Sequence, residues 1–415
     1  MITCTIKDLL DCGEAELRTG PHGSLLHAGE KSKTGTPIIH VRNIGFGDIR
    51  EEKPEFVPPE VVSRLPEHLV QTGDILFGRK SAVDRHAFIT EKHDGWFQGS
   101  DCVRLRLKSS SILPKFLSYY FLTNHHKQWM ISQCSHGEVM ESLNHAIISR
   151  IPLSIPPVHV QQEVVDLLSD YDELIETNRK RLKVLNEIVR SLYQEWFTCL
   201  RFPGYEQVTL IESELGLIPE GWLVQKLEVV ADINKTTLKK KTAPQIIHYV
   251  DVSSVSTGRI DRVEVIAFSE SSSRARRVVR RGDTIWSTVR PNKRIHSLVF
   301  AEELVVSTAF ATISPKFLPY SYLYCALTTD KFVDSLIRSA TGSAYPAVTT
   351  ECFINALILV PPSEVVEKFH AIAQDIFAQG NCIHEQIQNV CRSRELLLHK
   401  LLCDRSKDPV HLMPP

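Results

Sequence analysis

The chain has 415 residues, of which 43% are hydrophobic and 23% are charged, and its formal net charge at pH 7 is −1. This length allows two or three packed domains, and this composition excludes a disordered chain. No run approaches the roughly 18 apolar residues of a membrane span, and residues 1–17 lack the apolar segment of a signal peptide, so we expect a cytoplasmic protein with no membrane partner. With no overall positive charge, any nucleic-acid site must be formed by local basic patches.

The cysteines and histidines give no metal-binding pattern. The ten cysteines form neither a Cys-x-x-Cys pair nor a Cys/His ligand spacing, and the seventeen histidines include no His-x-x-x-His pair. We therefore predict no metal site, and we expect the cysteines to be reduced and to pack as small core residues.

Strands and turns dominate the prediction for residues 1–157, because short apolar runs alternate with stretches rich in glycine and proline. The stretch Arg18–Leu26 is predicted to be a turn-rich loop, and Gly73-Asp74 a turn that leads into a buried strand. The other predicted elements are a strand at Ile38–Val41, the strand at Ile75–Phe77, an alternating strand at Cys102–Leu107, a helix at Pro114–Met130 and a strand at Ile151–Ile155.

A long amphipathic helix is predicted from Val160 to Trp196, after the proline pair Pro156-Pro157. Its apolar residues step alternately by four and three, which is a heptad seam with one polar member. Roughly 37 residues would extend about 55 Å at 1.5 Å per residue, which exceeds the need of one domain, so the helix must find a partner. The seam consists of Val164, Leu168, Tyr171, Ile175, Asn178, Leu182, Leu185, Val189, Leu192 and Trp196.

The second half of the chain repeats the order of the first. Tyr249–Val252 corresponds to the first predicted strand, Gly282-Asp283 to the first Gly-Asp turn, and Ala340-Thr341-Gly342 to Ser135-His136-Gly137. The Pro361-Pro362 pair then introduces a second heptad pattern 205 residues after the first, with eight of ten seam positions apolar. Two helices that each expose an apolar stripe can bury it against each other, so we predict an antiparallel pair. Apolar residues off the first seam should face other partners, namely Leu167, Leu174, Ile188 and Phe197.

Basic residues recur beside the Gly-Asp turns of both halves. Five arginines lie between Arg274 and Arg281, and three further cations follow the next strand. Such a run alone is more often a solvated surface, but its recurrence favours contacts to phosphates or base edges. The chain thus has two similar domains with different side chains, held apart by a helix pair. Such a protein could recognise two different short features of duplex DNA at a fixed separation. The candidate DNA contacts are Arg18, Arg42, Asn43, Arg79, Lys80, Arg85, Arg274, Arg276, Arg290, Lys293 and Arg294.

In this order, the motifs resemble those of the specificity subunits of type I restriction-modification enzymes, over nearly the whole chain. The resemblance implies an α/β (α+β) fold with pseudo-twofold symmetry, in which two target-recognition domains are separated by two long antiparallel coiled-coil helices. The implied boundaries are 1–158 and 201–362 for these domains, 159–200 and 363–403 for the helices, and 404–415 for a tail. The matching signatures are Arg18–Leu26, Gly73–Leu76, Ile151-Pro152 with Pro156-Pro157 and Gln161–Glu163, Ser213–Trp222, and Gly282-Asp283.

Membership in this family implies a DNA-binding subunit without catalytic residues or cofactor, in which each domain reads one half of a bipartite target. It also implies docking of two modification subunits, which carry the methyl-donor site, and of restriction subunits, which carry the nuclease and the translocase. Two departures stand out: the second helix begins with Ser363–Val366 in place of Gln-Gln-Glu and carries Gly380 in its seam, and the lysine-rich loop 232–242 differs from Arg18–Leu26.

Two alternatives belong to other classes of protein. An independent DNA methyltransferase or nuclease would need catalytic motifs, and the sequence has neither an Asn/Asp-Pro-Pro-aromatic tetrapeptide nor a phosphate-binding loop. Gly45-Phe46-Gly47 imitates a methyl-donor loop but is better explained as a strand turn, and Glu51-Glu52-Lys53 lacks the strand and aspartate of a nuclease metal site. A protein-interaction adaptor with a coiled-coil spacer would explain the helices but not the two basic surfaces.

Overall fold

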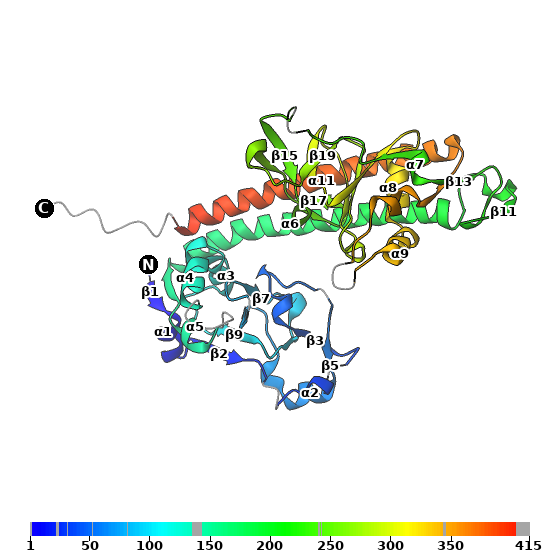
Figure 1. The fold of residues 1–415 in the computed structure, drawn as a ribbon. Coiled ribbons are helices and arrows are strands. Elements are labelled where there is room, and N and C mark those ends of the chain that lie inside the picture. The colour runs from blue at the N-terminus through cyan, green and yellow to red at the C-terminus, as the bar shows by residue number, and fades with distance from the viewer. Residues whose placement is uncertain are drawn as a thin grey trace. The chain divides into compact units, whose positions relative to one another are not determined.

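The structure, a computed structural model, divides into two compact units that we call unit 1 and unit 2 (Figure 1). Unit 1 comprises residues 1–177 together with residues 387 onward, and unit 2 comprises residues 178–386. The predicted tail 404–415, the Ser135-His136-Gly137 motif, Glu52 and part of the loop 18–26 lie outside the described residues. Those residues are 2–21, 25–30, 32–51, 53–80, 82–134, 143–239, 241, 243–342 and 346–403.

Unit 1 is a mixed arrangement of sheets and short helices. Its strands are β1 (Ile2–Thr5), β2 (Ala15–Thr19), β3 (Thr36–Ile39), β4 (Phe46–Gly47), β5 (Phe56–Val57), β6 (Ile75–Gly78), β7 (His86–Phe88), β8 (Phe97–Gln98), β9 (Cys102–Leu107) and β10 (Pro152–Ile155). The main sheet has the order β2-β9-β6-β7-β4, a smaller sheet has the order β5-β3-β8, and β1 pairs antiparallel with β10. The pairs β3–β8 and β4–β7 are parallel.

The short helices of unit 1 begin where the sequence supplies caps. Thr5 and Asp8 form a capping box at the start of the first helix, and the Asn144 side chain accepts from the Ile147 amide at the start of the last. The single helix predicted at Pro114–Met130 is wrong, because the chain forms two helices with a break at Leu122-Thr123. The helices are α1 (Ile6–Asp11), α2 (Pro59–Arg64), α3 (Pro114–Phe121), α4 (Asn124–Cys134) and α5 (His145–Ser149).

Unit 2 repeats this arrangement. Its strands are β11 (Leu210–Ser213), β12 (Gly216–Pro219), β13 (Leu223–Lys226), β14 (Ala231–Ile233), β15 (Ile246–Val250), β16 (Val255–Ser256), β17 (Arg259–Ile260), β18 (Glu264–Ala267), β19 (Ala275–Val279), β20 (Thr284–Ser287), β21 (His296–Leu298), β22 (Leu304–Ser307), β23 (Phe310–Pro315) and β24 (Leu357–Val360). Its short helices are α7 (Leu227–Val230), α8 (Tyr320–Thr328), α9 (Asp330–Ser339) and α10 (Thr350–Ile354).

The sheet orders confirm the predicted mixed fold class and show the internal repeat. In unit 2, β14-β23-β20-β21 matches β2-β9-β6-β7, β18-β15-β22 matches β5-β3-β8, and β13–β24 matches β1–β10. The parallel pair β3–β8 likewise has its counterpart in β15–β22. The turn before β6 and the turn before β20 each contain a glycine with positive φ, at Gly73 (92°) and Gly282 (90°), which explains the recurring Gly-Asp motif.

Two long helices contribute to the cores of both units. Helix α6 (Val158–Tyr193) continues into a π-helical turn at Gln194–Thr198, and α11 spans Ser363–Cys403. In unit 2 the Tyr193 ring lies 6.0 Å from the Phe369 ring, and a Cβ on Gly380 would lie 3.4 Å from Leu182. Residue numbers therefore rise along one helix as they fall along the other, so the two run antiparallel there (Figure 1).

The predicted seam of α6 is buried or partly buried at every position. Leu167, Leu174 and Ile188 are exposed as expected, but the prediction for Phe197 is wrong: it is 5% exposed and packs in the core of unit 2. The π-helical turn rotates the chain after Tyr193 and brings Phe197 inward. Gly380 does not loosen the second seam as a gap would, because Leu182 occupies the space beside it.

Candidate nucleic-acid interface

The loop between β6 and β7 carries three of the predicted contacts of unit 1. The Gly-Asp turn and the buried strand β6 lead the chain directly into Arg79 and Lys80, which have no carboxylate at ion-pair distance within the described part of the chain. The carbonyl of Arg79 accepts a hydrogen bond from the Leu143 amide at 2.8 Å. Arg85, at the other end of the loop, lies 4.0 Å from Asp84 and 5.1 Å from the centre of the Phe46 ring.

At the start of β6, Asp74 is a structural residue with two arginine partners. It is 1% exposed, and Arg106 binds both of its carboxylate oxygens at 2.7 Å. The Asp74 carboxylate also accepts from the Gln71 amide (2.8 Å), and Arg104 lies 3.8 Å away on the neighbouring strand. A bidentate pair of this kind fixes the turn geometry as well as the charge.

The loop between β20 and β21 is the counterpart in unit 2, and it contains Arg290, Lys293 and Arg294. Arg290 and Arg294 have φ values of 52° and 51°, a left-handed conformation that L-residues seldom adopt and that costs energy. The Arg290 amide donates to the Pro346 carbonyl (2.7 Å), and Val289 forms a bridge with Ala347. Lys293 is exposed on a 3-10 turn, Pro291–Lys293.

Asp330, the first residue of α9, holds one end of this loop. Its carboxylate pairs with Arg294 at 2.6 Å and with Arg190 of α6 at 3.2 Å, so Arg294 is engaged within unit 2. These pairs lower the pKa of Asp330, with the hydrogen bond from Arg294 as the largest cause. This contact could not be predicted from the sequence, because Asp330 and Arg294 are 36 residues apart and belong to no shared motif.

The arginine run of residues 274–281 lies mainly on β19, at the end of a different sheet from the β20–β21 loop. Arg274 is exposed, whereas Arg276 stacks against the Phe268 ring at 5.1 Å and donates to the Ala275 carbonyl at 2.7 Å. Arg280 and Arg281 have only loose ion pairs with Glu303 and Glu302, each at 3.9 Å. Of this run, Arg274 therefore remains the most available for a ligand.

Three predicted contacts of unit 1 have structural partners. Arg18 on β2 pairs with Glu16 at 3.2 Å, and Arg42 pairs with Glu55. Asn43 is 6% exposed and donates to the Arg50 carbonyl at 2.8 Å, which closes the turn after β3. The predicted strand Ile38–Val41 ends at Ile39, so Arg42 and Asn43 belong to a 3-10 turn, Val41–Asn43. All the candidate DNA contacts stay predictions, but these three have functions in the fold.

A buried histidine supports each loop. His86 (2% exposed) shares a 2.9 Å hydrogen bond with Ser118, and His296 (5% exposed) shares one of 3.2 Å with Tyr324. Burial lowers the pKa of His86 to about 3 and that of His296 to about 4. Both rings are neutral near pH 7, so the positive charge of these loops comes from arginine and lysine.

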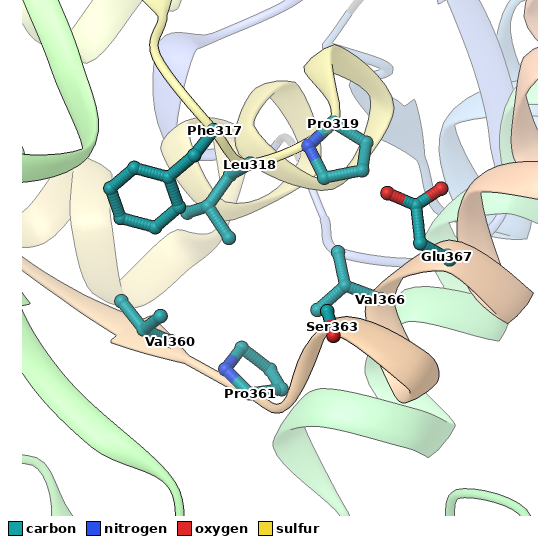
Figure 2. Close-up of a pocket in the computed structure, with 8 residues that line it drawn as sticks. All are labelled: Phe317, Leu318, Pro319, Val360, Pro361, Ser363, Val366 and Glu367. Atoms are coloured by element: carbon teal, nitrogen blue, oxygen red, sulfur yellow. The ribbon is translucent and has the colours of Figure 1, made fainter.

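A pocket of about 240 Å³ in unit 2 lies at the start of α11, where the sequence departs from that of α6. In unit 1 the Gln161 side chain is fully buried and bonds to the Leu113 amide (2.8 Å) and to the carbonyls of Ser111 (2.8 Å) and Pro156 (2.9 Å). The counterpart 205 residues later is Val366, which has no such polar group. Figure 2 shows the pocket beside it, between the Phe317–Pro319 loop and Pro361.

Both halves of α6 carry exposed apolar side chains. Leu167 and Leu174 are 39% and 45% exposed in unit 1, and Val184 and Ile188 are 52% and 47% exposed in unit 2. A hollow of about 550 Å³ lies beside Val184, Ile188 and Trp196. Exposed apolar stripes of this kind mark surfaces that bind other proteins.

Metal sites and membrane spans are both absent from the described residues. These residues contain no group of three or more His, Cys, Asp or Glu placed to hold a metal ion. Within the same residues, no helix combines the length and the apolar character needed to cross a bilayer.

Comparison with known proteins finds similarity to the specificity subunits of type I restriction enzymes. Residues 31–187 match the family model of the type I restriction modification DNA specificity domain. The type I restriction enzyme MjaIX specificity subunit of Methanocaldococcus jannaschii is 23% identical over 309 residues, which are 71% of this chain and 70% of that protein. The MjaVIII specificity subunit of the same organism is 23% identical over 351 residues, 81% of this chain and 80% of that protein.

A solved structure supports the fold. The crystal structure of the type I restriction-modification system S subunit from M. genitalium aligns with a TM-score of 0.56 and 13% sequence identity, over 96% of this chain and 95% of that one. At this identity the likeness concerns the fold alone.

Proposed function

We propose that this chain, which belongs to the family of type I restriction-modification specificity subunits, reads a bipartite DNA target with one half-site for each unit. As a specificity subunit it is the DNA-recognition member of its complex and is not itself an enzyme. The single observation that carries the bipartite reading is the recurrence of one loop, β6–β7 in unit 1 and β20–β21 in unit 2, at the same place in the same sheet order.

The two loops share their anchoring and differ in their side chains. In each unit the loop is hydrogen-bonded to the segment that precedes the last short helix, through Leu143 in unit 1 and Pro346 in unit 2. The cations differ, with the half-buried Arg79 and the exposed Lys80 in one loop and the exposed Lys293 in the other. Phosphate contacts position a protein on DNA and base contacts select the sequence, so equal placement with different side chains supports two different half-sites.

The long helices are proposed to set the distance between half-sites and to dock partner subunits. Four apolar residues support docking, because they lie off the seam and are 39% to 52% exposed: Leu167, Leu174, Val184 and Ile188. The partners proposed are two modification subunits, with restriction subunits joining the assembly, and the complex would work in the cytoplasm. Methyl transfer, cleavage and ATP use are assigned to those partners, since this chain needs no cofactor for DNA recognition.

A domain exchange tests the two-unit reading. Replacing residues 1–157 by the same region of a relative, and co-expressing the chimera with its modification subunit, should change one half of the methylated motif found by methylome sequencing. The other half should stay as in the parent, and an exchange of residues 201–362 should give the reverse result. If either exchange alters both halves together, the units do not read independently.

Binding to random duplex DNA separates this function from that of a protein-interaction adaptor. A DNA-binding complex should lose affinity steeply as salt rises, because contacts to phosphates release counterions. An adaptor should show weak binding with little salt dependence. The measurement is filter binding at a series of salt concentrations, with the complex assembled from full-length chains.

A further inference from the structure

The turn Gly45-Phe46-Gly47 holds an aromatic side chain at the surface of unit 1. Phe46 belongs to the edge strand β4, is 40% exposed, and donates its amide to the Asp48 carboxylate at 2.9 Å. A Cβ on Gly45 would lie 2.0 Å from that carboxylate, and Gly47 has a φ of 87°. Both glycines are therefore needed for this tight turn, and the turn holds the phenyl ring of Phe46 in an exposed position.

Two cations from other segments lie against this ring. The guanidinium carbon of Arg85, from the β6–β7 loop, is 5.1 Å from the ring centre, and the Nζ of Lys127, from α4, is 4.8 Å from it. Asp84 is the nearby carboxylate, 4.0 Å from the Nε of Arg85. That Nε is buried and makes no hydrogen bond to any described residue. Three segments thus bring one aromatic ring and two positive charges together, and one of them is the loop that also carries Arg79 and Lys80.

The repeat shows that the fold does not require an aromatic residue here. Gly258 is the counterpart of Gly47 in unit 2, because its φ is 82° and its amide donates to the carbonyl of His296, the residue that matches His86. The residue before it is Thr257, which is exposed and polar. Unit 2 therefore forms the corresponding turn, at Thr257-Gly258, without an aromatic ring. The fold does not need the phenyl group of Phe46 for packing, so we look for another function of this group.

We propose that Phe46 is a DNA contact that stacks against a base step in the half-site read by unit 1, while Arg85 and Lys127 turn to the flanking phosphates. The inference rests on the proposed function and names a contact of that same interface. Aromatic side chains are used in this way because every base has a π face, and apolar wedges can enter a partly unstacked step. Without DNA, Arg85 and Lys127 lie over the phenyl ring, and in the complex they would move to the phosphates.

The test exchanges the residues at the two corresponding positions, 46 and 257. The variants are Phe46→Thr and Thr257→Phe, with Phe317→Thr as a control that removes a phenyl ring 59% exposed elsewhere in unit 2. Each full-length variant is assembled with the modification subunit, and its affinity is measured on duplexes that carry the methylated motif of the parent. Phe46→Thr should weaken binding by about 5- to 150-fold, the usual effect of losing one base stack. Phe317→Thr should leave the affinity unchanged.

A fluorescent base locates the contact. Duplexes with 2-aminopurine at successive positions of the first half-site should change in emission at one or two positions when the parent complex binds. That change should vanish with Phe46→Thr and persist with Arg85→Gln, which should instead reduce the salt dependence. The inference is overturned if the Phe46→Thr complex binds and alters emission as the parent does. A parent complex that shows no preference for the motif would overturn the proposed function instead.

Discussion

The buried carboxylates of the two Gly-Asp turns should respond very differently to neutralisation. Asp74 faces Arg104 and Arg106 on β9, whereas the matching positions on β23 are Thr312 and Ser314. Replacing Asp74 by Asn removes one of the two carboxylates that face Arg104, which is 2% exposed, and leaves Glu16 at 3.4 Å as its counter-charge. Removing one partner of a buried ion pair costs about 3–5 kcal/mol, so we expect Asp74→Asn to destabilise unit 1 by that amount.

Asp283→Asn is the matched control in unit 2. Asp283 is 9% exposed, accepts from the Arg280 amide at 2.8 Å, and has no arginine in the place of Arg106. Burial raises the pKa of Asp283, so its ionised form is less stable in the folded chain than in the unfolded one. The neutral asparagine keeps an acceptor for the Arg280 amide, and we expect a change within about 1 kcal/mol.

Hydrogen exchange followed by mass spectrometry measures both effects in one sample, because peptides from β6 and β9 report on unit 1 and those from β20 and β23 on unit 2. At 1.36 kcal/mol per tenfold, Asp74→Asn should reduce protection in unit 1 by roughly 10²- to 10⁴-fold and leave unit 2 as it was. Adding Arg106→Gln should recover part of the loss. Equal effects of Asp74→Asn and Asp283→Asn would refute the assignment of the arginines as the cause.

Three further predictions concern pH, recognition and spacing. The pKa of His86 is lowered to about 3 in the folded chain, so its stabilising contribution is present above the unfolded pKa of about 6.5 and is lost as the pH falls toward 3; His86→Asn should flatten the stability loss measured by thermal unfolding over that range. Arg79→Ala or Arg290→Ala should cost about 1–3 kcal/mol of binding and relax one position of the motif if the arginine reads a base, or reduce the salt slope by about one if it holds a phosphate. Inserting seven residues after Asn178 and seven after Ile383 preserves both heptad seams and lengthens each helix by about 10.5 Å, so the methylated motif should gain a spacer about three base pairs longer; an active variant with an unchanged spacer would exclude the helices as the ruler.

The long helices could be predicted from the sequence because their signal is periodic and local. The seam residues of α6 recur every three or four positions, and the proline pairs mark where both helices begin. Phe197 was misplaced because a π-helical turn changes the period after Tyr193, and no residue in that turn announces the change. The break of the predicted helix at Leu122-Thr123 has the same origin, since apolar spacing continues across it.

The candidate interface could be predicted only as a set of loops. The Gly-Asp motif located the β6–β7 and β20–β21 loops, because a positive φ requires glycine at that turn. Which cations remain available depends on partners distant in the chain, as Glu55 for Arg42 and Asp330 for Arg294 show. Lys127 and Phe46 were missed for the same reason, since α4 and β4 come together only in the folded unit.

The division of the chain between the units has a consequence for its synthesis. Unit 2 is one continuous stretch, residues 178–386, whereas unit 1 needs residues 387 onward to finish its core. Leu398 is buried in that core, and Arg394 pairs at 2.5 Å with Asp172, which also accepts from Tyr119. Chains emerge from the ribosome N-terminus first, so the half that is made first is completed last. A ribosome that stalls, or a protease that cuts, before residue 387 leaves unit 2 with its own residues in place and removes the C-terminal part of α11 from unit 1.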